Sequence, residues 1–362
     1  MSAVLLTGFP GFIAGRLLRR LVRDRAPGTR FFLVVQSKFL FVARAKCQEI
    51  ELEFAHFEQH WHLIEGDITE PSLGMTEQAR ALVVDRVREV WHLAALYDLA
   101  ASQAVSYRVN VDGTQHVLDL CEQMVDLRSL HYISTCFVSG DRSGWVYEDE
   151  LDEGQGFKNH YESTKFWAEK QVKRRVDRLP IVVYRPAIVV GDSRTGETAK
   201  ADGPYYIMNL LMRLPKWAPM VNFGPSEAAV NLVPVDYVID CMALLSTDSR
   251  ALGRTFHLAD PHPLSARELL ERFCHHLGRA GVVGTLPQRV ANVAIASRRV
   301  RQAIRIPRQS FDYFEHPVRY DIANSASLLR ERTPPCPGID DYIPQLVRFA
   351  RDNPAIFQEV TA

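Results

Sequence analysis

The run Val4-Leu5-Leu6-Thr7-Gly8-Phe9-Pro10-Gly11-Phe12-Ile13-Ala14-Gly15 decides the fold of this chain. Its first three residues are typical of a buried strand, and a glycine-rich turn follows directly. After the turn, apolar residues recur on one face of an expected helix and arginines on the other. Such a turn lets the backbone approach a pyrophosphate, whose charge the helix N-terminus favours. The sequence therefore predicts a dinucleotide site formed by Thr7, Gly8, Phe9, Pro10, Gly11, Phe12 and Ile13.

Further apolar runs alternate with helical patterns along the first half of the chain. The runs are residues 31–35, 61–64, 89–93, 129–134 and 181–184, and the helical patterns lie around 75–88, 103–125 and 160–176. Buried strands that alternate with helices predict a parallel sheet with helices on both faces. We therefore expect an α/β protein with a Rossmann-type doubly wound sheet.

The alternation ends after Gly191, which suggests a second structural unit. Residues 192–230 are rich in glycine, proline and aromatic residues, whereas 231–238 and 254–258 resemble strands that return to the sheet. We expect residues 1–191 to form the NADP-binding core, with sheet returns near 231–260. Residues 192–362 would then be mainly a smaller, interleaved substrate lid.

The end of the second expected strand favours NADP(H) as the cofactor. NAD-preferring sites usually place a carboxylate here to bind the ribose 2′-hydroxyl. This chain has Gln36-Ser37-Lys38, with Arg44 and Lys46 a little later. Lys38 or Arg44 could pair with a 2′-phosphate, which a carboxylate would repel.

Two other strand ends fit the same cofactor. Asp67, followed by Ile68, could accept a hydrogen bond from the adenine amino group. Ala94 and Ala95 are small enough to let the nicotinamide ribose lie close. Asn110 either supports a water relay to a catalytic lysine or has a structural role, and the sequence leaves both open.

Tyr161 and Lys165 are spaced to lie on one face of a helix, one turn apart. A free tyrosine has a pKa of about 10, and a lysine ammonium together with an oxidised nicotinamide would favour its phenolate. Lys165 would also bind the ribose hydroxyls of the cofactor. Thr135 ends the fifth expected strand, where its hydroxyl could polarise a substrate carbonyl. These residues predict hydride transfer to a carbonyl carbon, with Tyr161 donating the proton.

The motifs together resemble the extended short-chain dehydrogenase/reductase family. Within that family, the chain is most similar to the branch of fatty acyl-CoA reductases and thioester reductase domains, also known as male-sterility-like domains. The narrower likeness is carried by residues 7–12, 66–74, 185–197 and 233–238. Ala14 departs from the pattern, although alanine is tolerated where the third glycine usually stands.

The resemblance implies NADPH-dependent reduction of an acyl thioester to an aldehyde or an alcohol. It also implies cofactor contacts from Pro186 and Ile188 and an oxyanion between Thr135 and Tyr161. The aromatic loop 202–206 would form part of the lid wall. The chain is too short for an adenylation or carrier domain, so we expect the thioester to arrive as a CoA ester or on a separate carrier protein.

Composition narrows the other possibilities. Lys plus Arg and Asp plus Glu are both 43, so no net charge draws the protein to nucleic acid. The cysteines are scattered, which predicts no metal site and a reducing, cytoplasmic compartment. No apolar run is long enough to span a membrane.

The segment 289–308 contains arginines and no acidic residue. It would contact CoA phosphates, a carrier protein or a membrane surface, or form a solvated helix. A monomer and a homodimer are both compatible with the sequence.

Three other functions remain open at this stage. A nucleotide-sugar epimerase or dehydratase shares the fold but usually retains NAD, which Gln36-Ser37-Lys38 disfavours. A ketone or hydroxysteroid-type reductase would use the same tyrosine and lysine. A cofactor-sensing binding protein would have no need of Thr135, Tyr161 and Lys165.

Overall fold

The computed structural model describes residues 2–98, 101–199, 202–223, 228–286 and 317–358. A seven-stranded sheet forms its centre, and all neighbouring strands in it are parallel. Strand order reverses at β1, which confirms the expected doubly wound Rossmann-type sheet. From edge to edge the strands are β12 (Thr255–Leu258), β7 (Ile181–Pro186), β5 (Ser129–Ile133), β4 (Glu89–His92), β1 (Ala3–Thr7), β2 (Arg30–Val35) and β3 (Trp61–Glu65).

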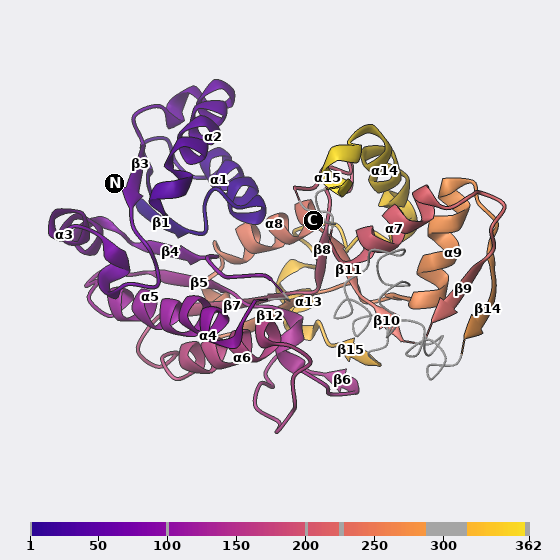
Figure 1. Ribbon diagram of the computed structural model, residues 1–362. Helices are drawn as coiled ribbons and strands as arrows, with labels where there is room; N and C mark the ends of the chain where they lie inside the picture. Colours follow the sequence, from indigo (N-terminus) through magenta and orange to yellow (C-terminus); the bar gives the residue numbers. More distant parts are fainter. Residues whose placement is uncertain (1, 99–100, 200–201, 224–227, 287–316, 359–362) are drawn as a thin grey trace.

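Both faces of the sheet are buried, each against its own apolar core. Because side chains alternate along a strand, neighbouring residues belong to opposite cores. Val4 and Leu6 belong to one apolar core, and Leu5 between them belongs to the other. The Val4 face packs against α1 (Phe12–Asp24), α2 (Leu40–Glu53), α8 (Val235–Leu245) and α13 (Ala323–Leu329). The Leu5 face packs against α3 (Glu77–Arg86), α5 (Gly113–Cys121) and α6 (His160–Lys173), as Figure 1 shows. α4 (Gln103–Tyr107) and a π-helical turn, η4 (Arg108–Asp112), lead into α5.

A third apolar core holds the lid together. It lies away from the sheet, at the right of Figure 1, and contains Tyr205, Phe273 and Tyr342. A capping box between Ser265 and Glu268 starts one of its helices. The lid helices are α7 (Pro204–Arg213), α9 (Ala266–Leu277), α14 (Ile339–Asp352) and α15 (Pro354–Gln358).

Short strand pairs lie outside the main sheet. Two of them join residues 1–191 to later segments: β8 (Ile188–Val190) pairs with β11 (Leu232–Pro234), and β6 (Gly144–Val146) pairs with β15 (Val318–Tyr320). The other two lie within residues 192–362: β10 (Ala229–Val230) pairs with β13 (Leu264–Ser265), and β9 (Met220–Phe223) pairs with β14 (Val282–Leu286). The segment 254–258 joins the main sheet as β12, but 231–238 does not. Its strand β11 pairs with β8, and α8 begins at Val235, because the apolar pattern there serves two short elements.

The described part of the chain contains no helix that is long and apolar enough to cross a membrane. Within the same residues, no cluster of three or more histidine, cysteine or acidic side chains is arranged to hold a metal ion. The basic segment 289–308 lies outside the described residues.

Candidate active site

The glycine loop after β1 is shaped for close approach of the backbone. Gly8 has a φ of +90°, and a Cβ there would lie 2.7 Å from the backbone nitrogen of Ala94. A Cβ on Gly11 would lie 2.7 Å from the carbonyl oxygen of Gly8. Gly11 also precedes the first turn of α1, and no side chain caps that turn. The free N–H groups at this helix start fit the pyrophosphate of a dinucleotide.

A buried hydrogen-bonded chain fixes this loop against the sheet. The backbone N–H of Ala94 donates to Oγ1 of Thr7, which lies 2.8 Å from Nδ1 of His92. Nε2 of His92 lies 3.0 Å from Oγ1 of Thr114 on α5. Burial, and to a lesser degree the charge of Lys165, lowers the pKa of His92 to about 3. The neutral imidazole therefore links β1, β4 and α5.

Phe9, Ala94 and Ala95 differ in how they meet the expected cofactor space. The side chain of Phe9 is 3% exposed and packs in the core, so only its backbone faces the loop. Ala94 is half-buried beside Gly8, whereas Ala95 is exposed.

Lys38, Arg44 and Lys46 follow β2, and each has a different partner. Nζ of Lys38 lies 4.9 Å from the ring centre of Phe39. The guanidinium of Arg44 lies over Trp61, the first residue of β3, and thus toward the opposite end of the strands. Nζ of Lys46 instead donates to the carbonyl oxygen of Pro10 at 2.8 Å, inside the glycine loop. Lys46 is therefore the cation of α2 that lies at the dinucleotide loop.

Asp67 and Ile68 lie beside this region. The carboxylate of Asp67 accepts hydrogen bonds from Nε2 of Gln36 at 2.7 Å and from the backbone of Thr69 at 2.9 Å. Burial acts to raise the pKa of Asp67, but these hydrogen bonds outweigh it and lower the pKa. Ile68 packs against Gly113, where a Cβ would lie 2.8 Å from its Cδ1.

Asn110 clamps two elements of the site together. Its side-chain amide bonds both backbone groups of Leu96, and Nδ2 also donates to Oγ1 of Thr164 at 3.0 Å. Thr164 directly precedes Lys165 on α6. Asn110 is 1% exposed and lies in the π-helical turn, a feature frequent at functional sites. These contacts join the turn η4 to α6 and to the segment after β4.

The side chains of Thr135 and Tyr161 lie close enough to interact, because the Thr135 hydroxyl acts to lower the pKa of Tyr161. Oγ1 of Thr135 also accepts from the backbone of Phe137 and lies 3.5 Å from the carbonyl oxygen of Pro186. Tyr97 covers Tyr161 edge-on, with ring centres 4.9 Å apart.

Burial has the largest effect on the pKa of Tyr161. Burial raises this pKa, the Thr135 hydroxyl opposes this rise, and the charges of Glu162 and Asp202 add to it. The phenol is therefore protonated, which is the form that donates a proton to a reduced carbonyl.

Lys165 bonds two groups on β5. Its Nζ donates to the hydroxyl of Tyr132 at 3.0 Å and to the carbonyl oxygen of Ile133 at 2.8 Å. Burial lowers the pKa of Lys165 to about 7, although the nearby charge of Glu169 acts to raise it. Sequence reasoning missed Tyr132, because no motif marks a tyrosine inside a buried strand.

A buried polar cluster supports α6 from behind. Arg185 on β7 donates from Nη2 to Oε1 of Glu169 at 2.6 Å and to the carbonyl oxygen of Glu150 at 2.8 Å. Glu169 also accepts from the hydroxyl of Ser134, which precedes Thr135. The cluster therefore joins α6, β7 and the end of β5 at the catalytic residues.

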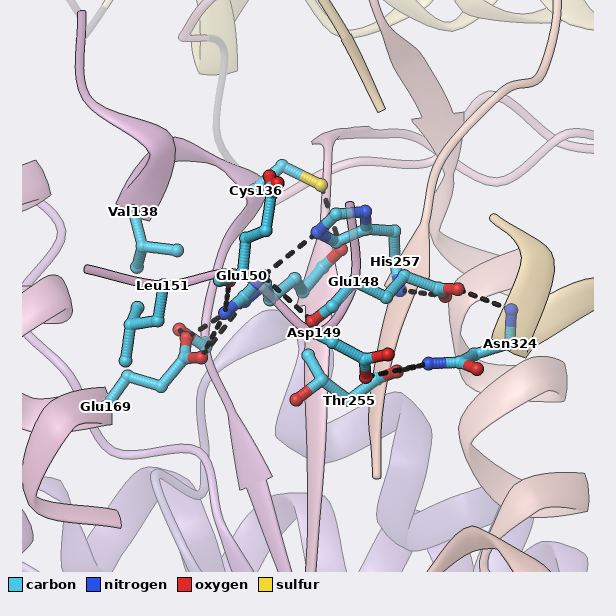
Figure 2. Close-up of polar contacts among 12 residues, drawn as sticks. Cys136, Val138, Glu148, Asp149, Glu150, Leu151, Glu169, Thr255, His257 and Asn324 are labelled. Atoms are coloured by element: carbon cyan, nitrogen blue, oxygen red, sulfur yellow. Dashed lines mark hydrogen bonds and ion pairs between the residues drawn. The ribbon is translucent and has the colours of Figure 1, made fainter. Parts of the chain in front are cut away.

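The same cluster continues to the edge of the sheet (Figure 2). The carboxylate of Glu148 accepts from the backbone of His257 at 2.8 Å and from the backbone of Asn324 at the start of α13. Burial raises the pKa of Glu148 to about 7, against the opposing effect of these hydrogen bonds and of those from Ser325. Residues far beyond 191 thus complete the support of the catalytic strand.

The remaining predicted residues lie where the lid begins. Pro186 ends β7 beside Thr135, and the backbone of Ile188 bonds the carbonyl oxygen of Asn231. The side chain of Ile188 lies next to Gly203 at the start of α7. In the expected lid wall, the hydroxyl of Tyr205 accepts from the backbone of Gly191 at 2.7 Å.

Comparisons with known proteins agree with this geometry. A family model described as male sterility protein matches residues 6–242, which is more than half of the chain. Fatty acyl-CoA reductase wat of Drosophila melanogaster is 25% identical over 281 residues, which are 68% of this chain and 54% of that protein.

Two solved structures show the fold. The terminal R domain of the myxalamid PKS-NRPS biosynthetic pathway has a TM-score of 0.79 at 24% identity, covering 98% of this chain and 91% of its own. UDP-glucuronic acid 4-epimerase from Bacillus cereus, in complex with NAD, has a TM-score of 0.68 at 19% identity, covering 97% and 99%. The family match, which spans the glycine loop, Tyr161 and Lys165, identifies the chain as a member of the male sterility protein family, within the extended short-chain dehydrogenase/reductases.

Proposed function

We propose that this protein is an NADPH-dependent reductase of acyl thioesters. The observation that carries the proposal is the nearness of Thr135 to a protonated Tyr161, at the edge of the parallel sheet where the glycine loop also begins. Two hydroxyls at one point can bind an oxygen that gains negative charge. The names of similar proteins, a fatty acyl-CoA reductase and the reductase domain of a nonribosomal peptide synthetase from Mycobacterium tuberculosis, support the thioester as substrate.

Different residues of the chain have different roles in the proposed reaction. Bound NADPH supplies the hydride. Thr135 and Tyr161 hold the carbonyl oxygen while the hydride adds to the carbonyl carbon, and Tyr161 transfers its proton. The carbon–sulfur bond then breaks, and the thiol leaves as an aldehyde forms. One hydride and one proton thus convert one thioester to one aldehyde and one thiol, and a second round would give the alcohol.

The preference for NADPH rests on charge near the end of β2. Gln36 takes the place of the usual carboxylate and donates to Asp67. Lys46 brings a cation to the glycine loop. A 2′-phosphate would pair with this ammonium.

A cytoplasmic location and a thioester from outside the chain belong to the same proposal. All six cysteines are free, as a reducing compartment favours. The acyl group would arrive on CoA or on a separate carrier protein.

A substrate panel tests the proposal. Purified protein is mixed with NADPH and acyl-CoA esters of different lengths, carrier-bound acyl groups, ketones and nucleotide sugars. We expect turnover of thioesters with release of free thiol, and its loss in Tyr161→Phe. Turnover of ketones or nucleotide sugars alone would instead support the alternatives on the same fold.

A further inference from the structure

The ammonium of Lys165 is held by two acceptors from β5. Nζ lies 3.0 Å from the Tyr132 hydroxyl and 2.8 Å from the carbonyl oxygen of Ile133, and 4.5 Å from the Tyr132 ring centre. Lys165 is 4% exposed and Tyr132 is 1% exposed. Because water cannot replace a lost partner at such a site, each acceptor affects both the position and the charge of the lysine.

The hydroxyl of Tyr132 lies among other polar side chains. Those of Thr114 and Ser134 are close enough to act on its pKa, which they lower. Thr114 continues to His92 and the glycine loop, and Ser134 donates to Glu169. Burial raises the pKa of Tyr132 well above its usual value, so the phenol is neutral. A neutral acceptor thus faces the lysine.

We propose that Tyr132 is a positioning residue for Lys165, whose hydroxyl keeps the buried lysine charged and directed at the cofactor side of the site. The two acceptors on β5 bind two of the three Nζ protons and so fix the orientation of Nζ. The third proton is left for another acceptor. The ring of Tyr132 lies 5.7 Å from that of His92, which bonds Thr7 at the start of the glycine loop. This inference rests on the proposed reductase function only for its kinetic consequence.

The direction of the expected pH effect follows from the groups around Lys165. They are Tyr161 and Glu169 on α6, Tyr132 on β5 and His92 on β4, with Arg185 on β7 reaching the lysine through Glu169. Burial lowers the pKa of Lys165 to about 7, whereas an acceptor stabilises the ammonium. Removal of the Tyr132 hydroxyl therefore lowers this pKa further.

The test compares Tyr132→Phe with Tyr184→Phe. Tyr184 is a matched control, because it is also buried in a sheet strand but bonds His131 at 3.0 Å. Lysine labelled with ¹⁵N at Nζ is titrated by NMR without cofactor or substrate, and the Lys165 signal is assigned by its absence in Lys165→Met. We expect the Lys165 midpoint to fall by about one pH unit in Tyr132→Phe and to stay unchanged in Tyr184→Phe.

The alkaline limb of kcat/KM for NADPH-dependent turnover should shift to lower pH by the same amount. An unchanged Lys165 midpoint in Tyr132→Phe, or an equal shift in both variants, overturns the inference. If Tyr132→Phe does not fold, Thr114→Val takes its place and should shift the midpoint in the same direction. No shift there would also overturn it. Because the titration needs no substrate, its result is independent of whether thioesters are reduced.

Discussion

The guanidinium of Arg185 and the carboxylate of Glu169 form a buried ion pair directly behind the catalytic helix, with Nη2 2.6 Å from Oε1 and side chains 1% and 0% exposed. Removal of one partner leaves an unpaired charge away from water. We predict that Arg185→Met lowers the free energy of unfolding by about 3–5 kcal/mol. Chemical denaturation measures it.

An exposed pair provides the control for this prediction. Arg267 and Glu271 lie 2.9 Å apart on α9 and are 42% and 41% exposed. Arg267→Met should cost no more than about 0.5 kcal/mol. A loss of less than about 1 kcal/mol in Arg185→Met would show that the buried pair does not hold α6 against β7.

The two glycines Gly8 and Gly15 should respond oppositely to alanine. At Gly8 the φ of +90° and the backbone of Ala94 at 2.7 Å leave no room for a Cβ. We predict a loss of about 1–3 kcal/mol in Gly8→Ala, with loss of NADPH binding. Nothing lies within 4 Å of a Cβ on Gly15 in α1, so Gly15→Ala should stabilise by about 0.5–1 kcal/mol.

Thermal unfolding and NADPH fluorescence titration measure these effects. Both variants add one methyl group, at two positions in the same loop-and-helix segment. A general effect of glycine-to-alanine substitution would therefore change the stability of both in the same direction. Equal stability of Gly8→Ala and wild type would contradict the described loop.

Lys46 should discriminate between the two nicotinamide cofactors. Its Nζ is fixed at Pro10, whereas Arg44 is directed over Trp61. We predict that Lys46→Gln weakens NADPH binding at least about tenfold, because a charge-assisted hydrogen bond is lost, and leaves NADH binding nearly unchanged. Arg44→Gln and Lys38→Gln should have smaller effects in the same titration. Equal weakening of NADPH and NADH in Lys46→Gln would place the lysine away from the 2′-phosphate.

The stability of the protein should depend on pH through Lys165. Its pKa is lowered from 10.5 to about 7 by burial, so between these values the unfolded chain binds a proton that the folded chain does not. The free energy of unfolding should therefore rise with pH above 7, by up to about 1.4 kcal/mol per unit, relative to Lys165→Met. Denaturation of both proteins from pH 6 to pH 9 measures the difference. If the free energy of unfolding depended on pH in the same way in both proteins, folding would not shift the pKa of Lys165.

Local patterns predicted the central sheet and the residues that we propose for the site. The apolar run before Gly8 and the spacing of Tyr161 and Lys165 each lie within one element and its neighbour. Because these patterns depend on residues close together in the sequence, the sequence alone predicts them. The end of β5 placed Thr135 at the same edge of the sheet as the glycine loop, because parallel strands end together.

Contacts across the sheet could not be predicted in this way. The Tyr132–Lys165 bond, the Lys46–Pro10 bond and the Arg185–Glu169 pair join different elements, and their sequence patterns say only that each position is buried or charged. The periodicity of apolar residues also does not predict which other strand a given strand pairs with. Residues 232–234 therefore pair with β8, and the support of β7 comes partly from Glu148 and α13.

The most direct test of the central claim is deuteride transfer. NADPH deuterated at the transferring C4 position is incubated with an acyl thioester and either wild-type protein or Tyr161→Phe, and the product is analysed by mass spectrometry. We predict one deuterium at the former carbonyl carbon of the aldehyde, an equal amount of free thiol, and neither product in Tyr161→Phe. Unlabelled product, or undiminished reduction in Tyr161→Phe, would contradict the account.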